Sequence, residues 1–437
     1  MCIRHIMKIP TGGKMQKTNK IRVGTAAVLA VVLGVSSLIG LSSSANAADP
    51  VTINFWSRGA QADFIASVGA EFNKINPNIQ VKVTTIPDAE FVQKLSTASQ
   101  SGSAPDITSV DLILVPYFAK NGVFEDLTSY TNGLSFKSKL SPAHMALGLY
   151  NKKQYALPFT AEASVLFWNK DLFKKAGLDP NKGPKTFAEI EAAAKAITAL
   201  GGDYKGFYFS GACGGCNIFT FAPLMWASGG DILTKAGQPT FTDKNVAKAL
   251  SFYNRLWSKG YVAKSAKTDN GASFAAPFAA GKTGMVGAGA FFVGSLKANP
   301  EINYGVTPLP GATGGKGSFA GGDNIAILKG TKNPVEAKIF LDWALNAGQK
   351  FIATKAILPI RSDIAASDYV PQDPRYKVMA DAMAYGKTPY SVAYTPLIAD
   401  GQSPWVKMLQ SAIFDGKIAA AQAAAQKQAL AIVKKQG

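Results

Sequence analysis

Histidine, the residue most often used for metal binding and acid–base catalysis, occurs only twice in the 437 residues. His5 lies near the N-terminus, and His144 is alone in the rest of the chain. A zinc site built on histidine needs two or three imidazoles, and a Ser/His/Asp triad needs one beside its nucleophile. The sequence therefore argues against most metallohydrolases and serine hydrolases. We expect no catalytic residue, no metal site and no cofactor.

Two cysteines form a C-x-x-C pair, Cys213 and Cys216, in the segment Gly211-Ala-Cys-Gly-Gly-Cys-Asn217. In an oxidising compartment such a pair most simply forms one local disulfide, since the glycines let the loop close. A thiol oxidoreductase uses the same spacing, but its pair opens a helix directly after a strand, whereas this pair lies in a glycine-rich stretch. A zinc site would need two further ligands. We therefore predict a structural disulfide.

Motifs for nucleotide binding and hydrolysis are incomplete. Gly281-Lys-Thr283 ends like a P-loop, but position 276, where the first glycine belongs, is Ala276, and Gly287-Ala-Gly289 lacks the third glycine of a dinucleotide fingerprint. Glycoside hydrolysis needs a carboxylate pair. The sequence offers candidates without selecting two of them: Glu90, Asp111, Glu162, Asp231 and Asp323.

The N-terminal stretch has the order of an export signal. From Met15, basic residues at 17, 20 and 22 precede an apolar run over 23–41 and the sequence Ala45-Asn-Ala47. This order predicts a secretory signal peptide over 1–47, cleaved after Ala47, with residues 1–14 an over-extended start. An uncleaved membrane anchor is the alternative, because the run is nearly long enough to span a bilayer. Since no cysteine follows the cleavage site, we expect a secreted protein, periplasmic or cell-surface associated, without a lipid anchor of its own.

Composition places the chain among globular proteins, with 47% hydrophobic and 17% charged residues. Without the six basic residues of the leader, 40 of the 46 basic side chains remain against 28 acidic ones, a net charge of +12. Such a charge suits an anionic ligand, a nucleic acid or a membrane surface. The lysines are scattered along the chain, however, so we interpret them as solvated surface and expect no nucleic-acid partner.

Strands and helices alternate after the leader. Alternating apolar residues predict strands over 51–56, 79–85 and 105–111, with helices around 64–72 and 91–98 between them. This β-α-β-α-β order predicts a mainly parallel sheet with flanking helices and a ligand at the carboxyl ends of its strands.

Later helices carry their own start and stop signals. Thr186-Phe-Ala-Glu189 is a capping box, Asp243 begins a helix that ends at Gly260, and Asn333-Pro334 begins one that we expect to end at Gly348. Connections over 307–322 and 388–404 are too long for tight turns and suggest crossings between domains or loops over a cleft.

Short motifs follow one another in a fixed order over nearly the whole chain after the leader. They are Val51-Thr-Ile-Asn-Phe-Trp56, the segments 71–81 and 102–111, Tyr155-Ala-Leu-Pro158, the segments 166–179 and 184–187, Phe278 to Met285, Gly305 to Pro310, Phe319-Ala-Gly-Gly322 and Leu358-Pro-Ile-Arg361. Each motif is loose, but together they resemble one family. That family is the extracellular solute-binding proteins, family 1, the sugar-binding components of bacterial ABC importers.

The resemblance implies an α/β, two-lobe periplasmic-binding-protein fold of the Venus flytrap type, each lobe a mainly parallel sheet flanked by helices. Hinge crossings are expected near 160–165, 319–325 and 361–374. Lobe 1 would then comprise residues 48–160 and 323–365, and lobe 2 residues 161–322 and 366–437. The lobes would close on a sugar, and the permease of the transporter would recognise the closed form.

A sugar site needs flat apolar faces against the ring and polar groups for the hydroxyls. By resemblance we expect the aromatic residues Trp56, Trp226, Phe291 and Phe292 and the polar residues Arg58, Asp111, Glu162, Asp323, Asn324 and Arg361 to contact the ligand. Relatives usually have a tryptophan where this chain has the two phenylalanines. The other interpretation stays open, in which the tryptophans are core residues and Asp111 and Glu162 are capping or surface groups.

The function we predict is high-affinity binding of a mono- or oligosaccharide by a monomer that is not an enzyme, followed by delivery to the permease subunits. One alternative is an importer component for an anionic small molecule, which would use the positive charge and a cluster of Tyr385, Tyr390 and Tyr394. A secreted glycoside hydrolase is the other.

Overall fold

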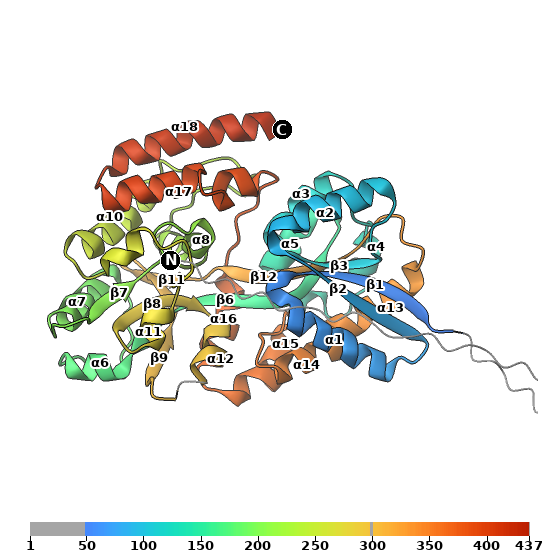
Figure 1. Ribbon diagram of the computed structural model, residues 1–437, viewed down its shortest axis with the longest axis horizontal. Coiled ribbons are helices and arrows are strands. Elements are labelled where there is room, and N and C mark those ends of the chain that lie inside the picture. Colours follow the sequence, from blue (N-terminus) through green and yellow to red (C-terminus); the bar gives the residue numbers. More distant parts are fainter. Residues whose placement is uncertain (1–48, 298–299, 437) are drawn as a thin grey trace, which may run out of the picture. The chain divides into compact units, whose positions relative to one another are not determined.

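The computed structural model describes residues 49–297 and 300–436 (Figure 1). The predicted signal peptide and start lie outside the described residues. Residues 49–437 form one compact unit by their contacts. Within the described part of the chain, no helix combines the length and apolar character needed to cross a membrane.

The first part of the sheet contains the predicted β-α-β-α-β unit. Strand β1 (Val51–Arg58) pairs in parallel with β2 (Ile79–Ile86) on one side and with β3 (Ile107–Asp111) on the other. Helices α1 (Ala62–Ile75) and α2 (Asp88–Ser101) connect them, and α2 ends at Gly102 with φ of +70°. Ile53 and Phe55 alternate inward on β1 and are fully buried. The predicted strands and helices are confirmed here.

Two long strands connect this unit to the rest of the sheet. Strand β6 (Leu157–Asn169) pairs antiparallel with β12 (Ala320–Ile327) through its first half and with β8 through its second half. Strand β12 in turn lies between β6 and β3, with Asp323 opposite Asp111. In Figure 1 these two strands lie side by side between the blue strands and the green and yellow ones.

The second part of the sheet is built around β8 (Thr283–Gly289), which pairs in parallel with β7 (Lys205–Tyr208). Strand β9 (Tyr304–Thr307) pairs with β6. Parallel pairs thus form the two outer parts of the sheet, and antiparallel pairs occur where β6 and β12 pass through it. The α/β two-lobe fold class predicted from the sequence is confirmed.

Smaller strands form two hairpins, β4 (Leu149–Tyr150) with β5 (Lys153–Gln154) and β10 (Leu309–Gly311) with β11 (Gly314–Gly317). The remaining helices are α3 (Val115–Lys120), α4 (Thr128–Asn132), α5 (Pro142–Leu147), α6 (Lys170–Lys175), α7 (Phe187–Thr198), α8 (Gly214–Thr220), α9 (Ala222–Ala227), α10 (Lys244–Ser258), α11 (Ala276–Ala279), α12 (Phe291–Lys297), α13 (Pro334–Leu345), α14 (Ala347–Thr354), α15 (Ser362–Ile364), α16 (Tyr376–Tyr385), α17 (Pro404–Leu409) and α18 (Ile418–Gln436).

Two helix starts have the caps that the sequence predicts. The hydroxyl of Thr186 accepts from the backbone N–H of Glu189 at 3.1 Å, and the carboxylate of Glu189 accepts from the N–H of Lys185 at 2.7 Å. The carboxylate of Asp243 caps α10 through the N–H groups of Asn245 and Val246. These bonds satisfy amide groups that a helix start leaves without partners.

One predicted helix end is wrong. The helix that begins at Pro334 ends at Leu345, and α14 begins at Ala347 and continues through Gly348. A Cβ at position 348 would lie 3.0 Å from the carbonyl oxygen of Trp343 and 3.3 Å from its ring. The glycine therefore permits close packing of the two helices instead of ending one of them.

The predicted disulfide between Cys213 and Cys216 is present, with the two Cα atoms 5.2 Å apart. Its setting differs from our expectation. The pair lies at the start of α8, with Cys213 as the capping residue, and five residues separate α8 from the end of β7. The expectation was wrong because Gly214 and Gly215, which lie between the cysteines, belong to the first turn of α8. The backbone N–H groups of such a turn have no partner within the helix.

Candidate ligand-binding site

A cavity of about 250 Å³ lies where β6 and β12 meet the ends of β1 and β3. Its lining comes from both parts of the sheet. It consists of Arg58, Asp111, Ile113, Glu162, Gly215, Ile218, Phe219, Phe291, Phe319, Gly321, Gly322 and Tyr394. This is the place where an open α/β sheet usually holds a ligand, outside the carboxyl ends of its parallel strands.

Arg58, the last residue of β1, is held by a buried carboxylate. Its Nε and Nη2 both donate to Oδ1 of Asp323, at 2.9 and 2.6 Å. The other oxygen of Asp323 accepts from the hydroxyl of Ser109 at 2.7 Å. Burial acts to lower the pKa of Arg58, but the carboxylates of Asp323 and Asp111 hold that pKa above its ordinary value. The charge of Arg58 is therefore largely matched before any ligand arrives.

Asp111 lines the cavity at the end of β3, with weak contacts to the protein. One oxygen accepts from the N–H of Ile113 at 3.3 Å, and the other lies 3.5 Å from Nη1 of Arg58. Burial raises the pKa of Asp111 to about 6, against the opposing effect of Arg58, and the charge of Asp323 raises it further. Its carboxylate lacks the close partners that a buried charge needs.

Glu162, in the middle of β6, is the second carboxylate in the lining. Its two oxygens accept from the backbone N–H of Phe291, each at 3.2 Å. Burial raises the pKa of Glu162 to about 8, although the N–H groups of Phe291, Ala290 and Ala163 act to lower it. Neither Lys nor Arg forms an ion pair with it among the described residues.

Three aromatic rings form one wall of the cavity. Phe219 stacks on Phe291 with the ring centroids 6.4 Å apart, and it meets Phe319 edge to face at 5.5 Å. Phe291 is half exposed, whereas Phe319 is buried. A flat, rigid apolar wall opposite carboxylates is suited to a ligand that has both C–H faces and polar groups.

Tyr394 completes the lining from the C-terminal part of the chain. Its side chain is buried, with 3% exposed, and its hydroxyl has no hydrogen-bond partner within the described residues. Burial, and then the negative charge of Asp111, raise the pKa of Tyr394. A buried hydroxyl at a cavity wall without a protein partner is available to a ligand.

A family model described as bacterial extracellular solute-binding protein matches residues 56–351, more than half of the chain. This protein belongs to that family. Membership of an extracellular family implies an exported protein.

Similar proteins agree in sequence and in fold. The diacetylchitobiose binding protein DasA of Streptomyces coelicolor is 27% identical over 335 residues, which cover 74% of this chain and 76% of that one. A structure of CpMnBP1 with mannotriose bound is 27% identical, with a TM-score of 0.70 over 87% of this chain and all of that one. The sugar-binding protein MalE of Xanthomonas citri is 23% identical, with a TM-score of 0.78 over 88% of this chain and 98% of that one.

Four of the ten ligand contacts predicted for this solute-binding protein line the cavity: Arg58, Asp111, Glu162 and Phe291. Asp323 lies directly behind, bound to Arg58 and fully buried. Trp226 lies behind the lining. Its ring stacks on that of the cavity residue Phe319 with the centroids 6.3 Å apart, and its indole N–H donates to the carboxylate of Asp231 at 3.0 Å.

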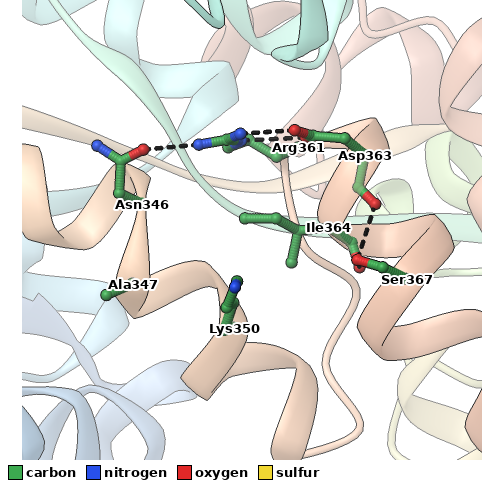
Figure 2. Close-up of a pocket in the computed structure, with 7 residues that line it drawn as sticks. All are labelled: Asn346, Ala347, Lys350, Arg361, Asp363, Ile364 and Ser367. Atoms are coloured by element: carbon green, nitrogen blue, oxygen red, sulfur yellow. Dashed lines mark hydrogen bonds and ion pairs between the residues drawn. The ribbon is translucent and has the colours of Figure 1, made fainter.

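The other four predicted contacts lie elsewhere. Trp56 lines a separate hollow along α2, Phe292 packs against Phe167 in the core, and the amide of Asn324 donates to the carbonyl of His144. Arg361 lines a groove beside α14, where it binds Asn346 and Asp363, as Figure 2 shows.

Several lining residues were missed by the sequence predictions. Phe319 and the two glycines after it stood in a family motif, but the motif alone did not distinguish a turn from a ligand contact. Gly215 lies between the cysteines, and a Cβ at this position would meet no atom within 4 Å. Ile113, Ile218 and Phe219 have no signal in the sequence beyond their apolar or aromatic character, and Tyr394 was named only for the anion-binding alternative.

Proposed function

We propose that this protein binds a sugar outside the cytoplasmic membrane and delivers it to the permease subunits of an ABC importer. The observation that carries the proposal is the cavity whose lining combines three phenylalanines with Asp111, Glu162 and Tyr394. Phenyl rings stack on the C–H face of a sugar ring, and the carboxylates and the hydroxyl bond its hydroxyl groups.

Lobe closure is the means by which binding would be signalled. We keep the division into lobe 1 (48–160 and 323–365) and lobe 2 (161–322 and 366–437). With this division Arg58 and Asp111 belong to lobe 1, and Glu162, Phe291 and Tyr394 belong to lobe 2. A ligand that contacts both sets favours the closed state because it binds that state more tightly. The protein would act as a monomer with the permease as its partner.

The relatives support a carbohydrate ligand. DasA is named for diacetylchitobiose, and CpMnBP1 was crystallised with mannotriose. The cavity of about 250 Å³ is small beside typical ligand pockets of roughly 300–1,000 Å³, which favours a monosaccharide or disaccharide here.

An anionic ligand is less well supported by the lining. Two carboxylates line the cavity, its single cation Arg58 is bound to Asp323, and no arginine cluster is among its lining residues. Of the three tyrosines considered for anion binding, only Tyr394 lines this cavity. Tyr390 lines a separate hollow with Tyr150.

A thermal-shift screen with the purified protein tests the proposal. The ligands are monosaccharides, α- and β-linked disaccharides, polyols and sugar acids. A ligand at ~100 times its Kd adds roughly 2.7 kcal/mol to the free energy of unfolding, a rise in Tm of several degrees. We expect a shift with one class of sugar, which is then recovered unchanged. A shift with sugar acids alone would favour the anion alternative, and cleavage of the sugar would favour the hydrolase.

A further inference from the structure

The cavity has more carboxyl groups than cations, in contrast to the positive net charge of the chain. Asp111 and Glu162 line it, and Asp323 and Asp88 lie next to Arg58, which is the single cation in the lining. Arg58 gives its two shortest bonds to Asp323, which lies behind the lining. Glu162 therefore has no cation among the described residues, and Asp111 shares Arg58 with Asp323 at a longer distance of 3.5 Å.

Charged and polar groups from several elements surround each carboxylate. Asp111 is faced by Arg58 from β1, Asp323 from β12, Asp88 from α2 and Tyr394 from the C-terminal part. Glu162 is faced by the backbone N–H groups at the start of α12 and by the phenol of Tyr369. Only Arg58 carries a positive charge in this set, and its nearest approach to Asp111 is 3.5 Å.

The rest of the lining suits a cation as well as a sugar ring. The faces of Phe219, Phe291 and Phe319 are electron-rich and attract a positive charge at close range. The free hydroxyl of Tyr394 offers an oxygen that accepts a hydrogen bond. Carboxylates beside aromatic rings in a small cavity are a combination that recognises protonated amines.

We propose that the ligand is a sugar or sugar-like ring that carries a protonated amine, which binds between the carboxylates of Asp111 and Glu162 and the phenylalanine wall. This inference rests on the proposed function, since it names the class of sugar. The amine supplies the positive charge that the two carboxylates lack, and a neutral sugar supplies only hydroxyl hydrogen bonds. A sugar acid would add a third negative charge.

Matched sets of sugars test this directly. Kd is measured at pH 7.5 by calorimetry for glucose, galactose and mannose, for their 2-amino derivatives, and for their uronic acids. Cellobiose and chitobiose, the disaccharide of glucosamine, extend the comparison to two rings. We expect the amine member of at least one set to bind tenfold or more tightly than its neutral parent, and the acid not to bind.

Measuring the protons released on binding distinguishes an ion pair between the amine and Glu162 from an amino sugar that only fits the cavity better. The pKa of Glu162 is about 8 in the empty cavity, so at pH 7 its carboxyl is largely protonated. An ammonium group that binds beside it favours the carboxylate, and a proton is released to the buffer. Calorimetry in two buffers of different ionisation enthalpy measures this release, at a pH low enough that the free amine is already protonated and takes up no proton on binding. We expect it for the amino sugar and not for its neutral parent.

Two variants and a control test whether Glu162 and Asp111 cause the preference for the amine. Glu162→Gln and Asp111→Asn keep the shape of the side chains, and we expect each to reduce the amine preference, the ratio of the Kd of the neutral sugar to that of the amino sugar, about tenfold. The control is Glu191→Gln, because Glu191 pairs with Arg255 and Lys259 away from the cavity. It should leave the preference unchanged.

The outcomes distinguish this inference from the function on which it rests. Equal or tighter binding of the neutral parents would overturn the amine preference and leave sugar binding in place. An unchanged preference in both cavity variants would also overturn it. If neither neutral, basic nor acidic sugars bind, the proposed function fails and this inference fails with it.

Discussion

At the residue scale, the acid–base behaviour of Glu162 gives the empty protein an unusual dependence on pH. The folded state raises the pKa of Glu162 from 4.5 to about 8, and that of Asp111 from 3.8 to about 6. The folded state therefore holds more protons than the unfolded state between these values, and stability falls as the pH rises.

We expect the Tm of the ligand-free protein to decrease from about pH 5 to about pH 8 by this contribution, with the loss accumulating steadily between the unfolded and folded pKa values of the two carboxyl groups and ending above the folded pKa of Glu162. His144, whose pKa burial lowers to about 4, acts in the other direction because it is protonated in the unfolded state below pH 6.5. When the Tm of Glu162→Gln is subtracted from that of the wild type at each pH, the contributions of His144 and other titrating groups cancel. A difference that does not vary with pH would contradict the prediction.

Gly322, which lines the cavity, has a backbone conformation that residues other than glycine rarely adopt. Gly322 has φ of +117°, and a Cβ there would lie 2.0 Å from the carbonyl oxygen of Thr160. Gly322→Ala should lower the free energy of unfolding by at least about 1–3 kcal/mol, measured by urea denaturation. Gly294→Ala is the matched control, since Gly294 lies in α12 with open space around it, and this change should raise stability by about 0.5–1 kcal/mol. Equal effects of the two changes would refute the argument.

The sequence predicted part of the site, and the failures have a geometric cause. Arg58, Asp111 and Glu162 were found because they lie at strand ends or at an expected crossing. Phe291 and Phe292 are neighbours on a helix, so their side chains point about 100° apart, and only Phe291 reaches the cavity while Phe292 enters the core. Sequence identifies such a pair but not which member faces the ligand.

At the element scale, the disulfide at the start of α8 fixes the wall that Gly215 contributes to the cavity. Closing so short a loop should stabilise the fold by about 2 kcal/mol or less. We expect reduction, or the double change Cys213→Ser and Cys216→Ser, to lower Tm by a few degrees. It should also weaken sugar binding, because α8 carries Ile218 and Phe219 of the lining.

The double change Cys213→Ala and Cys216→Ser controls for the cap, since a serine at position 213 can accept the hydrogen bond that the sulfur of Cys213 now accepts from the N–H of Cys216, and an alanine cannot. Unchanged Tm and unchanged Kd after reduction would show that the bond stabilises neither the helix start nor the cavity wall.

The regular elements were predictable where periodicity and caps agree. The strands of 51–58 and 79–86 alternate cleanly, and α7 and α10 begin at the predicted caps. The connection over 307–322 was not resolved by the sequence, since the β10–β11 hairpin within it is short and glycine-rich. Such strands are stabilised by tertiary contacts and have little local signal.

At the scale of the whole molecule, the sheet joins segments that are far apart in sequence. Strand β12 lies between β3 and β6, more than two hundred residues after the first of these. Local patterns predicted the parallel β-α-β units, but antiparallel pairing of this kind depends on contacts that no local pattern encodes. The two-lobe fold class was expected from the family resemblance, and not from periodicity.

Because β12 pairs with β3, β6 pairs with β8 and β9, and these two long strands pair with each other, the described chain should unfold as one unit. We expect a single calorimetric transition with equal van't Hoff and calorimetric enthalpies, and a saturating sugar should move the whole transition upward without splitting it. Chemical shifts of the alanines in α18, none of which lines the cavity, would provide an independent probe. Two separate transitions would show that the lobes unfold independently.

The stacking of Trp226 on Phe319 has a practical consequence. Phe319 forms part of the cavity wall, and the indole N–H donates to Asp231 at 3.0 Å, so the emission of this tryptophan depends on a ring that a sugar bound in the cavity would contact. The protein thus contains its own optical reporter. Trp226→Phe should remove the fluorescence change on titration while leaving the calorimetric affinity nearly intact.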